Sequence, residues 1–301
     1  MKTKIYLGNS VLHMRFGIVI SDAEDWTARS LLAAFQRRRA EAKFLDFSEL
    51  AVSIGGQLSF SSNEVDLLEL GGLIVRDLGR RGLHDVAFRF EVLRTLASMG
   101  MRVINPPEAL AIAANKSATT LALQRYGVPM PRTTITTDPD KALKVLCEYG
   151  KAVSKPLFGY KGKDIQLLAE SDADKLLKIL QRNGIVYLQD FVESTHPRDV
   201  RAFVVGDQVL GAIYRVAPPG AWISNLAQGG RAERCPMTEE LTELAVRASH
   251  AVGAIYSGVD LLETSEGLKV IEVNGTPSGK GIYQALRIDV TEVIVDHALK
   301  L

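Results

Sequence analysis

The chain has 301 residues, of which 47% are hydrophobic and 24% are charged, and its formal net charge is +1. These values are typical of a soluble globular protein with room for two or three packed units, and they predict neither a nucleic-acid nor a membrane partner. Its two cysteines, Cys147 and Cys235, are too few for a disulfide framework or a thiolate metal site, which indicates reduced thiols in a cytoplasmic protein.

The N-terminal segment MKTKIYLGNSVLHM is basic, and no apolar stretch of useful length follows it. We therefore expect no signal peptide. No apolar run reaches the roughly 20 residues that a membrane helix needs. Met14 is an alternative start to Met1, because the first clear folded element begins just after it.

The first third of the chain alternates between strand and helix patterns. Strands are predicted at 15–21, 42–47, 71–79 and 101–105, with helices at 22–40 and 83–100. This alternation predicts a small parallel α/β unit over residues 14–105, and we assign residues 1–105 to an N-terminal α/β domain.

The rest of the chain divides into two predicted parts. Residues 106–189 carry two helical stretches around Asn115 and Lys116 and then a β-α-β-β-α-β pattern, which predicts a central domain. Residues 190–301 begin with a hairpin that turns at Gly206-Asp207. A helix at about 238–252 and the strands VDLLE and LKVIEVN follow.

A glycine-rich segment, SKPLFGYKGKDI, follows the predicted strand that ends at Lys155. Gly159 and Gly162 flank a turn in which backbone N–H groups can approach phosphate oxygens, and Lys155 can add a point charge to the same phosphates. The segment is neither a Walker loop nor a dinucleotide fingerprint, because no GK[ST] appears and a strand follows the turn. An ordinary hairpin with exposed lysines is the alternative.

Charged residues also stand inside two later strands. Asp199 and Arg201 are two apart and share one strand face, either as part of a site or as a surface ion pair of little energetic value. Arg215 lies between Ile213 and Val216. It either reaches a charged ligand or extends its head group to water.

Three oxygen-bearing side chains lie on the last two predicted strands, which the polar turn TSEG joins. Asp260 belongs to the first of these strands, and Glu272 and Asn274, two residues apart, belong to the second. A hairpin brings all three to one face. Oxygen donors of this kind suit Mg²⁺, whereas uncompensated buried carboxylates are costly. The spacing therefore predicts a metal site, and three unconnected polar residues at strand ends are the alternative.

Together these segments resemble the ATP-grasp superfamily, and most closely the RimK-type glutamate ligases. The resemblance covers residues 14–301 and is carried best by the C-terminal third. Its motifs are D-V-R-A-F-V-V-G at 199–206, S-N-L at 224–226, G-G at 229–230, G-V-D-L-L at 258–262 and E-V-N-G-T-P at 272–277. It implies a three-part α/β fold, in which a central ATP-grasp subdomain (106–189) and a C-terminal one (190–301) hold ATP between them.

The resemblance also implies a role for each matching residue. The residues that it implies bind ATP are Lys116, Lys155, Gly159, Gly162, Gln189, Asp190, Phe191, Asp199, Ser224 and Asn225. The resemblance implies that Lys155, Arg201 and Arg215 act on the phosphates or the acyl phosphate. It implies that Asp260, Glu272 and Asn274 hold Mg²⁺ or Mn²⁺, as two ions.

The implied reaction is ATP-dependent joining of an amino acid, glutamate, to the carboxylate of an acceptor through an acyl phosphate. Val216, Ile223 and Gln228 stand where the ribosomal-protein-modifying members carry basic residues, which favours a small cofactor such as tetrahydromethanopterin or coenzyme F420. A protein C-terminus and a non-catalytic ATP sensor are the alternatives. A homo-oligomer is compatible with the sequence, which decides neither the number of residues added nor α- versus γ-linkage.

Overall fold

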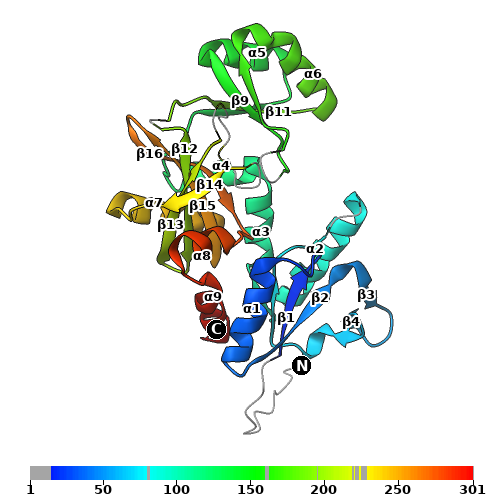
Figure 1. Cartoon of the computed structure of the whole chain (residues 1–301). Helices are drawn as coiled ribbons and strands as arrows, with labels where there is room; N and C mark the ends of the chain where they lie inside the picture. Colours follow the sequence, from blue (N-terminus) through cyan, green and yellow to red (C-terminus); the bar gives the residue numbers. More distant parts are fainter. Residues whose placement is uncertain are drawn as a thin grey trace. The chain divides into compact units, whose positions relative to one another are not determined.

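The computed structural model describes residues 15–79, 82–159, 163–194, 196–218, 220, 224 and 229–300. The N-terminal segment, with both candidate start residues, lies outside this part. The chain divides into two compact units, Met1–Val103 and Ile104–Leu301, whose elements are labelled in Figure 1. No helix within the described ranges is long and apolar enough to cross a membrane.

Unit 1 is built on a four-stranded sheet of order β2-β1-β6-β7. Strand β1 pairs in parallel with both β2 and β6, as the alternating pattern predicted. Helix α1 begins after Asp25, whose side chain accepts a hydrogen bond from the backbone N–H of Ala28. The bounds are β1 Arg15–Ile20, α1 Trp26–Arg37, β2 Glu41–Asp46, β6 Gly72–Val75, α2 Leu83–Ser98 and β7 Arg102–Ile104.

A second, antiparallel sheet of order β3-β4-β5 also lies in unit 1. Its strands are β3 Leu50–Ser53, β4 Ser59–Ser62 and β5 Val65–Asp66, flanked by the short helices η1 Phe47–Glu49 and η2 Leu67–Glu69. The sequence analysis did not anticipate this sheet. Its strands are short and rich in serine, which weakens the hydrophobic alternation by which strands are recognised.

Unit 2 begins with helices α3 (Pro107–Ala114) and α4 (Lys116–Arg125) and an antiparallel sheet of order β10-β9-β11-β8. This sheet and its two helices follow the predicted β-α-β-β-α-β order. Buried apolar residues of α5, α6 and the sheet form one core cluster. The bounds are β8 Thr133–Thr136, α5 Pro139–Tyr149, β9 Lys151–Lys155, β10 Gln166–Ala169, η3 Glu170–Asp172, α6 Ala173–Asn183 and β11 Val186–Asp190.

A five-stranded sheet of order β14-β13-β12-β15-β16 forms the rest of unit 2 with three helices. Val205 pairs with Gln208 across the predicted Gly206-Asp207 turn, and Thr264 pairs with Gly267 across the second. The sequence analysis did not anticipate β14, α8 or α9. The bounds are β12 Arg198–Val205, β13 Gln208–Val216, β14 Arg231–Arg234, α7 Glu239–Val252, β15 Tyr256–Thr264, β16 Gly267–Asn274, α8 Lys280–Leu286 and α9 Val290–Lys300.

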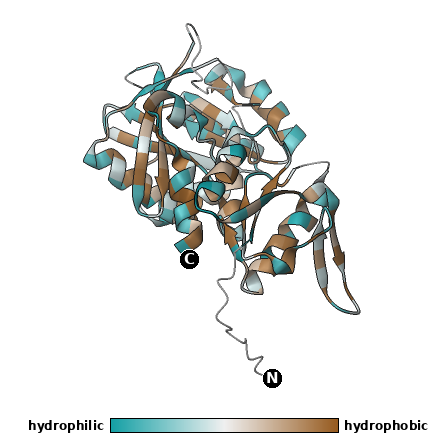
Figure 2. Ribbon diagram, turned by 60° about the horizontal axis from the view of Figure 1, so that its bottom comes forward, coloured by the Kyte–Doolittle hydropathy of each residue, from teal (hydrophilic) through white to brown (hydrophobic). Residues whose placement is uncertain are grey.

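The five-stranded sheet has two different faces. Val200, Ala202 and Val204 of β12 point to the face where α7 contributes to the main core cluster. Asp199 and Arg201 alternate with them and therefore point to the other face. Figure 2 shows helices striped with hydrophobic and hydrophilic residues, as expected for elements that bury one side. The division of unit 2 at residues 189 and 190 into two subdomains stays a prediction.

Candidate active site

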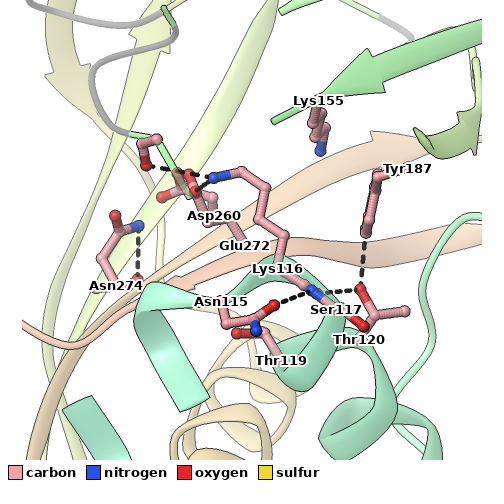
Figure 3. A network of polar contacts seen from close by, with 12 residues as sticks. Asn115, Lys116, Ser117, Thr119, Thr120, Lys155, Tyr187, Asp260, Glu272 and Asn274 are labelled. Carbon is pink, nitrogen blue, oxygen red and sulfur yellow. Dashed lines mark hydrogen bonds and ion pairs between the residues drawn. The ribbon is translucent and has the colours of Figure 1, made fainter. Parts of the chain in front are cut away.

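The polar face of the five-stranded sheet brings the predicted carboxylates into register. Asp260 on β15 lies directly across from Glu272 on β16, and across from Arg201 on β12. Asn274 lies opposite Gly258, one side-chain step further along the same face. The hairpin predicted from TSEG therefore places the three oxygen-bearing residues together, as Figure 3 shows.

Two arginines hold Asp260. Arg201 donates to both of its carboxylate oxygens, with Nη2 at 2.7 Å from Oδ2, and Nη2 of Arg215 lies 2.8 Å from that same Oδ2. Arg215 also donates to both oxygens of Asp199, at 2.6 Å each. Ser224 completes the group through a 2.6 Å hydrogen bond from its hydroxyl to Asp199. We call these five residues the arginine–carboxylate cluster.

The arginine–carboxylate cluster is buried, and its charges compensate one another. The exposed fractions of Asp199, Arg215 and Asp260 are 5%, 5% and 2%. Burial by itself would raise the pKa of Asp260, but Arg201 and Arg215 hold that pKa below its ordinary value. Burial would likewise lower the pKa of Arg215, but Asp260 and Asp199 raise it. Asp260 is therefore ionised and paired near neutral pH.

This pairing differs from the alternatives raised for the strand charges. Asp199 does not pair with its strand neighbour Arg201, because it accepts hydrogen bonds from Arg215 across the β12–β13 ladder. Arg201 instead reaches Asp260 on β15. Arg215 does not extend to water, since it is almost fully buried. Both strand arginines lie inside the site.

Lys116 enters the site from the first turn of α4. Asn115 caps this helix by accepting hydrogen bonds from the backbone N–H groups of Ser117 and Ala118. The ammonium of Lys116 lies 3.1 Å from Glu272 and 3.4 Å from the carbonyl oxygen of Gly159. The lysine thus touches both the predicted metal ligand and the start of the glycine segment.

Lys155 comes from the end of β9 and donates a 2.7 Å hydrogen bond to Oε1 of Gln189 on β11. Its neighbours on β11 are polar and buried: the exposed fractions of Gln189 and Tyr187 are 4% and 3%. Burial lowers the pKa of Lys155 to about 8, against the opposing effect of Glu272. Lys155 is therefore a cation without a carboxylate directly paired to it among the contacts of the described residues.

A small pocket lies between the two sheets of unit 2, beside these lysines. Helix α4 contributes Lys116 and Thr120, β11 contributes Tyr187 and Gln189, and β16 contributes Val270, Ile271 and Glu272. Leu123 and Met130 add apolar surface. The pocket thus combines apolar walls with the polar side chains of Lys116, Gln189 and Glu272, which is the usual make-up of a small-molecule site.

The predicted adenine hinge follows β11. The carboxylate of Asp190 pairs with Arg132 at 2.7 Å, and its backbone N–H donates to the carbonyl of Arg132. The backbone N–H of Phe191 donates to Lys151. The side chain of Asp190 therefore fixes the end of β11 to the segment before β8.

At two glycines of the resemblance motifs, neighbouring side chains leave little or no room for a Cβ atom. A Cβ on Gly258 would lie 2.9 Å from Pro277 and 3.1 Å from Cδ of Arg201, so glycine leaves room for the Arg201 side chain. A Cβ on Gly275 would lie 3.0 Å from Ala113 of α3. The turn after Asn274 is thus held close to α3, whereas the sequence analysis did not identify a packing partner for it.

Thirteen of the fifteen predicted site residues lie in the described part of unit 2, and two fall outside it. Lys116, Lys155, Gln189, Asp199, Arg201, Arg215, Ser224, Asp260, Glu272 and Asn274 lie at or beside the polar face, and Asp190 and Phe191 lie at the end of β11. Gly159 is described through its contacts with Lys116 and Pro156. Gly162 and Asn225 lie outside the described residues.

The oxygen donors of the site fit a hard divalent cation. Glu272 is partly exposed, and Asn274 donates its amide N–H to the carbonyl of Gly258 at 3.3 Å, which leaves its amide oxygen as the donor atom. Among the described residues no three His, Cys, Asp or Glu side chains gather as ligands of one metal ion. A metal here would therefore depend on the amide oxygen of Asn274 as well as on the carboxylates.

Three residues of the site escaped the sequence analysis. Tyr187, Thr120 and Thr133 form hydrogen bonds around Gln189. Tyr187 stands two residues before Gln189 on the same strand, which places both side chains on one face. That spacing could have drawn attention to it, whereas the threonines come from distant segments.

Comparison with known proteins agrees with this geometry. Residues 113–298 match the RimK-like ATP-grasp domain. The chain is 40% identical to the tetrahydromethanopterin:alpha-L-glutamate ligase of Methanosarcina acetivorans, over 94% of this chain and 98% of the relative. It is 35% identical to the ligase of the same name from Methanococcus maripaludis, over 95% and 98%.

A solved structure shares the fold. The ATP-grasp ligase PsnB, in complex with a phosphomimetic variant of its minimal precursor, Mg and ADP, superposes with a TM-score of 0.75 at 23% identity, over 95% of this chain and 97% of that one. The arrangement of sheets and helices is thus that of an ATP-grasp protein. The chain belongs to the RimK-like ATP-grasp family.

Proposed function

We propose that the chain is an ATP-dependent carboxylate–amine ligase that adds L-glutamate to a carboxylate of a small cofactor of the tetrahydromethanopterin type. Near-full-length similarity to relatives that carry this name in three organisms, at 33–40% identity, supports the substrate class. The observation that carries the reaction class is the meeting of three cations, Lys116, Arg201 and Arg215, with carboxylates on two paired strands. The ammonium of Lys155, which is held by the amide of Gln189, adds a fourth positive charge near Glu272.

The first step transfers a phosphoryl group between two anions. An oxygen of the acceptor carboxylate attacks the γ-phosphorus of ATP, the bond from that phosphorus to the bridging oxygen breaks, and ADP leaves with an acyl phosphate in place. Charge repulsion contributes to this barrier, so preorganised cations accelerate the step. Lys155 is suited to this role because its charge is not directly paired with a carboxylate in the described contacts.

The arginines are suited to the second step. The glutamate amine attacks the acyl carbon, negative charge builds on the carbonyl oxygen, and the C–O bond to phosphate then breaks as the amine loses a proton. Arg201 and Arg215 can exchange part of their contact with Asp260 for phosphate or for that oxyanion. Because both are also anchored on neighbouring strands, the exchange requires only side-chain movement.

Glu272, Asn274 and Asp260 are the residues that would hold Mg²⁺ or Mn²⁺, as two ions. The ion would neutralise charge on the β- and γ-phosphates. Release of one oxygen of Asp260 from Arg201 or Arg215 would complete the donor set. The assignment of ATP-binding roles to Lys116, Lys155, Gln189, Asp190, Phe191, Asp199 and Ser224 is part of this proposal, as are a cytoplasmic location and the option of a homo-oligomer.

The test is a phosphate-release assay with ATP, Mg²⁺, glutamate and a panel of acceptors, read in parallel by mass spectrometry. The panel contains a tetrahydromethanopterin-type pterin, a coenzyme F420-type flavin and a peptide with an acidic C-terminus. The proposal expects phosphate release and a mass gain of one or more glutamyl units with the pterin only. Modification of the peptide alone would instead identify a protein-modifying ligase.

The double variant D260N/E272Q is the matched control for the assay. Both changes keep the shape of the side chains and remove negative charge from the predicted metal ligands. Unchanged turnover in the folded double variant would contradict the metal assignment.

A further inference from the structure

A series of hydrogen bonds, buried at its centre, runs from Lys155 to the first turn of α4. It contains Gln189, Tyr187 and Thr120, and Thr133 joins it from the side. Nζ of Lys155 lies 2.7 Å from Oε1 of Gln189, and Nε2 of Gln189 lies 3.2 Å from the hydroxyl of Tyr187. That hydroxyl lies 2.9 Å from Oγ1 of Thr120, as Figure 3 shows for the Tyr187–Thr120 contact.

The direction of each hydrogen bond in this series follows from Thr120 and Thr133, whose hydroxyl protons are given to backbone carbonyls. Thr120 donates its single hydroxyl proton to the carbonyl of Lys116 at 2.8 Å, so its oxygen accepts from Tyr187. Tyr187 has then used its proton and accepts from Gln189. Thr133 likewise donates to the carbonyl of Pro131 at 3.0 Å and accepts from Gln189 at 3.1 Å.

Both N–H groups of Gln189 are therefore committed to acceptors, and its amide oxygen faces Lys155. An ammonium group has only donors, so this oxygen is the one atom of the Gln189 side chain that can hold it. Burial makes the arrangement costly to disturb, because a buried donor left without a partner is not compensated by water. The amide of Gln189 is locked in one orientation by the residues around it.

We propose that Gln189 is a positioning residue for Lys155, and that Tyr187 and Thr133 act through Gln189 by fixing its amide. The side chain of Gln189 then serves the lysine, so the contribution of this residue to ATP binding, which the family resemblance implied, is indirect. The inference rests on the proposed function only for the role of Lys155 in turnover. The contact itself is independent of that role.

This series of hydrogen bonds also links Lys155 to the backbone of Lys116. Thr120 accepts from Tyr187 and donates to the backbone carbonyl of Lys116, and the backbone N–H of Lys116 donates to the carbonyl of Leu157 at 3.0 Å. The first turn of α4 is thus tied to β11 on one side and to the segment after Lys155 on the other. Loss of the Gln189 amide should therefore loosen Lys155 first and leave Lys116 in place.

The first experiment measures Lys155 without any turnover. Purified full-length protein is treated with an amine-acylating reagent, and the labelling rate of each lysine is followed by mass spectrometry of its peptide. In Gln189→Met the Lys155 rate should rise by about threefold or more, because the lost hydrogen bond favoured the ordered ammonium. The Lys116 rate should not change.

Gln166→Met is the matched control. Gln166 lies on β10 opposite Ser154, so it points to the face away from Lys155, and it receives the same chemical change in the same sheet. A Lys155 rate that is equal in Q189M, Q166M and wild type would overturn the proposal, whatever the enzyme's substrate. Melting temperatures of both variants establish that each is folded.

The second experiment is a double-mutant cycle on ATP turnover. Q189M should lower kcat by about tenfold with little change in the KM for ATP, which is the pattern of a lost transition-state interaction. In the K155M background the same substitution should have almost no further effect. If Q189M lowers kcat by the same factor in both backgrounds, Gln189 does not act through Lys155 and the proposal fails.

The two experiments separate the two proposals. Absence of turnover with every acceptor would contradict the proposed function. The labelling rates of Lys155 would still decide whether Gln189 positions it. Normal turnover in Q189M with an unchanged labelling rate would remove the positioning role alone.

Discussion

Two polar networks in unit 2 hold their cations in opposite ways. In the arginine–carboxylate cluster, Arg201 and Arg215 meet Asp199 and Asp260, and almost every charge has a charged partner. Around Lys155 the partners are an amide and hydroxyl groups. The charges of the first network therefore neutralise one another, whereas the second network keeps a positive charge that is available to an incoming anion.

The largest effect should come from breaking the arginine–carboxylate cluster. Arg215→Met leaves Asp199 and Asp260 buried without their shared cation, which should destabilise the fold by about 3–5 kcal/mol. Urea unfolding measures the change. Arg231→Met is the control, because Arg231 and Glu233 form an exposed pair whose loss should cost about 1 kcal/mol or less. Equal losses in the two variants would contradict the account of a buried cluster.

The next effect concerns a carboxylate that belongs to neither network but touches Lys116. Glu272→Gln keeps the size of the side chain and removes its charge, so turnover should fall on the order of 100-fold, and binding of Mn²⁺ in the presence of ATP should weaken. Electron paramagnetic resonance of free Mn²⁺ follows the binding directly. Glu266→Gln, in the exposed turn of the same hairpin, should leave both quantities unchanged.

The charge of Lys155 should appear in the pH dependence. The Lys155 pKa of about 8 means that the ammonium is present below pH 8 and is lost as the pH rises through that value. If the protonated ammonium of Lys155 is needed to stabilise the phosphates of ATP, kcat/KM for ATP should fall by about tenfold for each pH unit above pH 8. Lys155→Arg, which stays protonated, should abolish the fall. A flat profile in the wild-type enzyme would contradict the prediction.

Stability should depend on the same group with a defined sign. The folded-state pKa of Lys155 is lower than its ordinary value of 10.5, so between about pH 8 and 10.5 the unfolded chain binds more protons. The contribution of Lys155 to stability therefore increases as pH rises through this window. Lys155→Met should remove that dependence, which urea unfolding at several pH values can measure.

The smallest effect should come from one hydroxyl in the network around Lys155. Tyr187→Phe removes the bridge between Gln189 and Thr120 and should destabilise the protein by about 1 kcal/mol or somewhat more. Thermal unfolding measures it. Tyr126→Phe is the control, since Tyr126 is 53% exposed. Equal melting temperatures of the Tyr187→Phe and Tyr126→Phe variants would contradict the prediction.

Much of the polar face could be predicted because its spacing is local. The TSEG turn sets the hairpin that puts Asp260 across from Glu272, and the Gly206-Asp207 turn sets the hairpin that puts Asp199 across from Arg215. Period-two alternation then decides which side chains share a face. These relations involve neighbouring strands joined by short turns, where sequence distance and spatial distance agree.

The partners that could not be predicted come from contacts between distant segments. Arg201 meets Asp260 because β12 pairs with β15, and nothing in either strand specifies that neighbour. Thr120 and Tyr187 are 67 positions apart, and both residue types are common in elements without a site. Helix α8 is short and follows a glycine-rich turn, so its sequence lacks the repeated apolar spacing that reveals a longer helix.

The position of Lys116 on its helix has one more consequence. The N-terminal end of a helix carries partial positive charge, which disfavours a cation placed there and attracts an anion. Lys116 occupies the first turn of α4, beside the capping residue Asn115. Helix and side chain therefore repel each other electrostatically, and the carboxylate of Glu272, 3.1 Å from the ammonium, offsets that repulsion. The negative charge on β16 therefore holds the cation of α4 in a place that the helix itself disfavours.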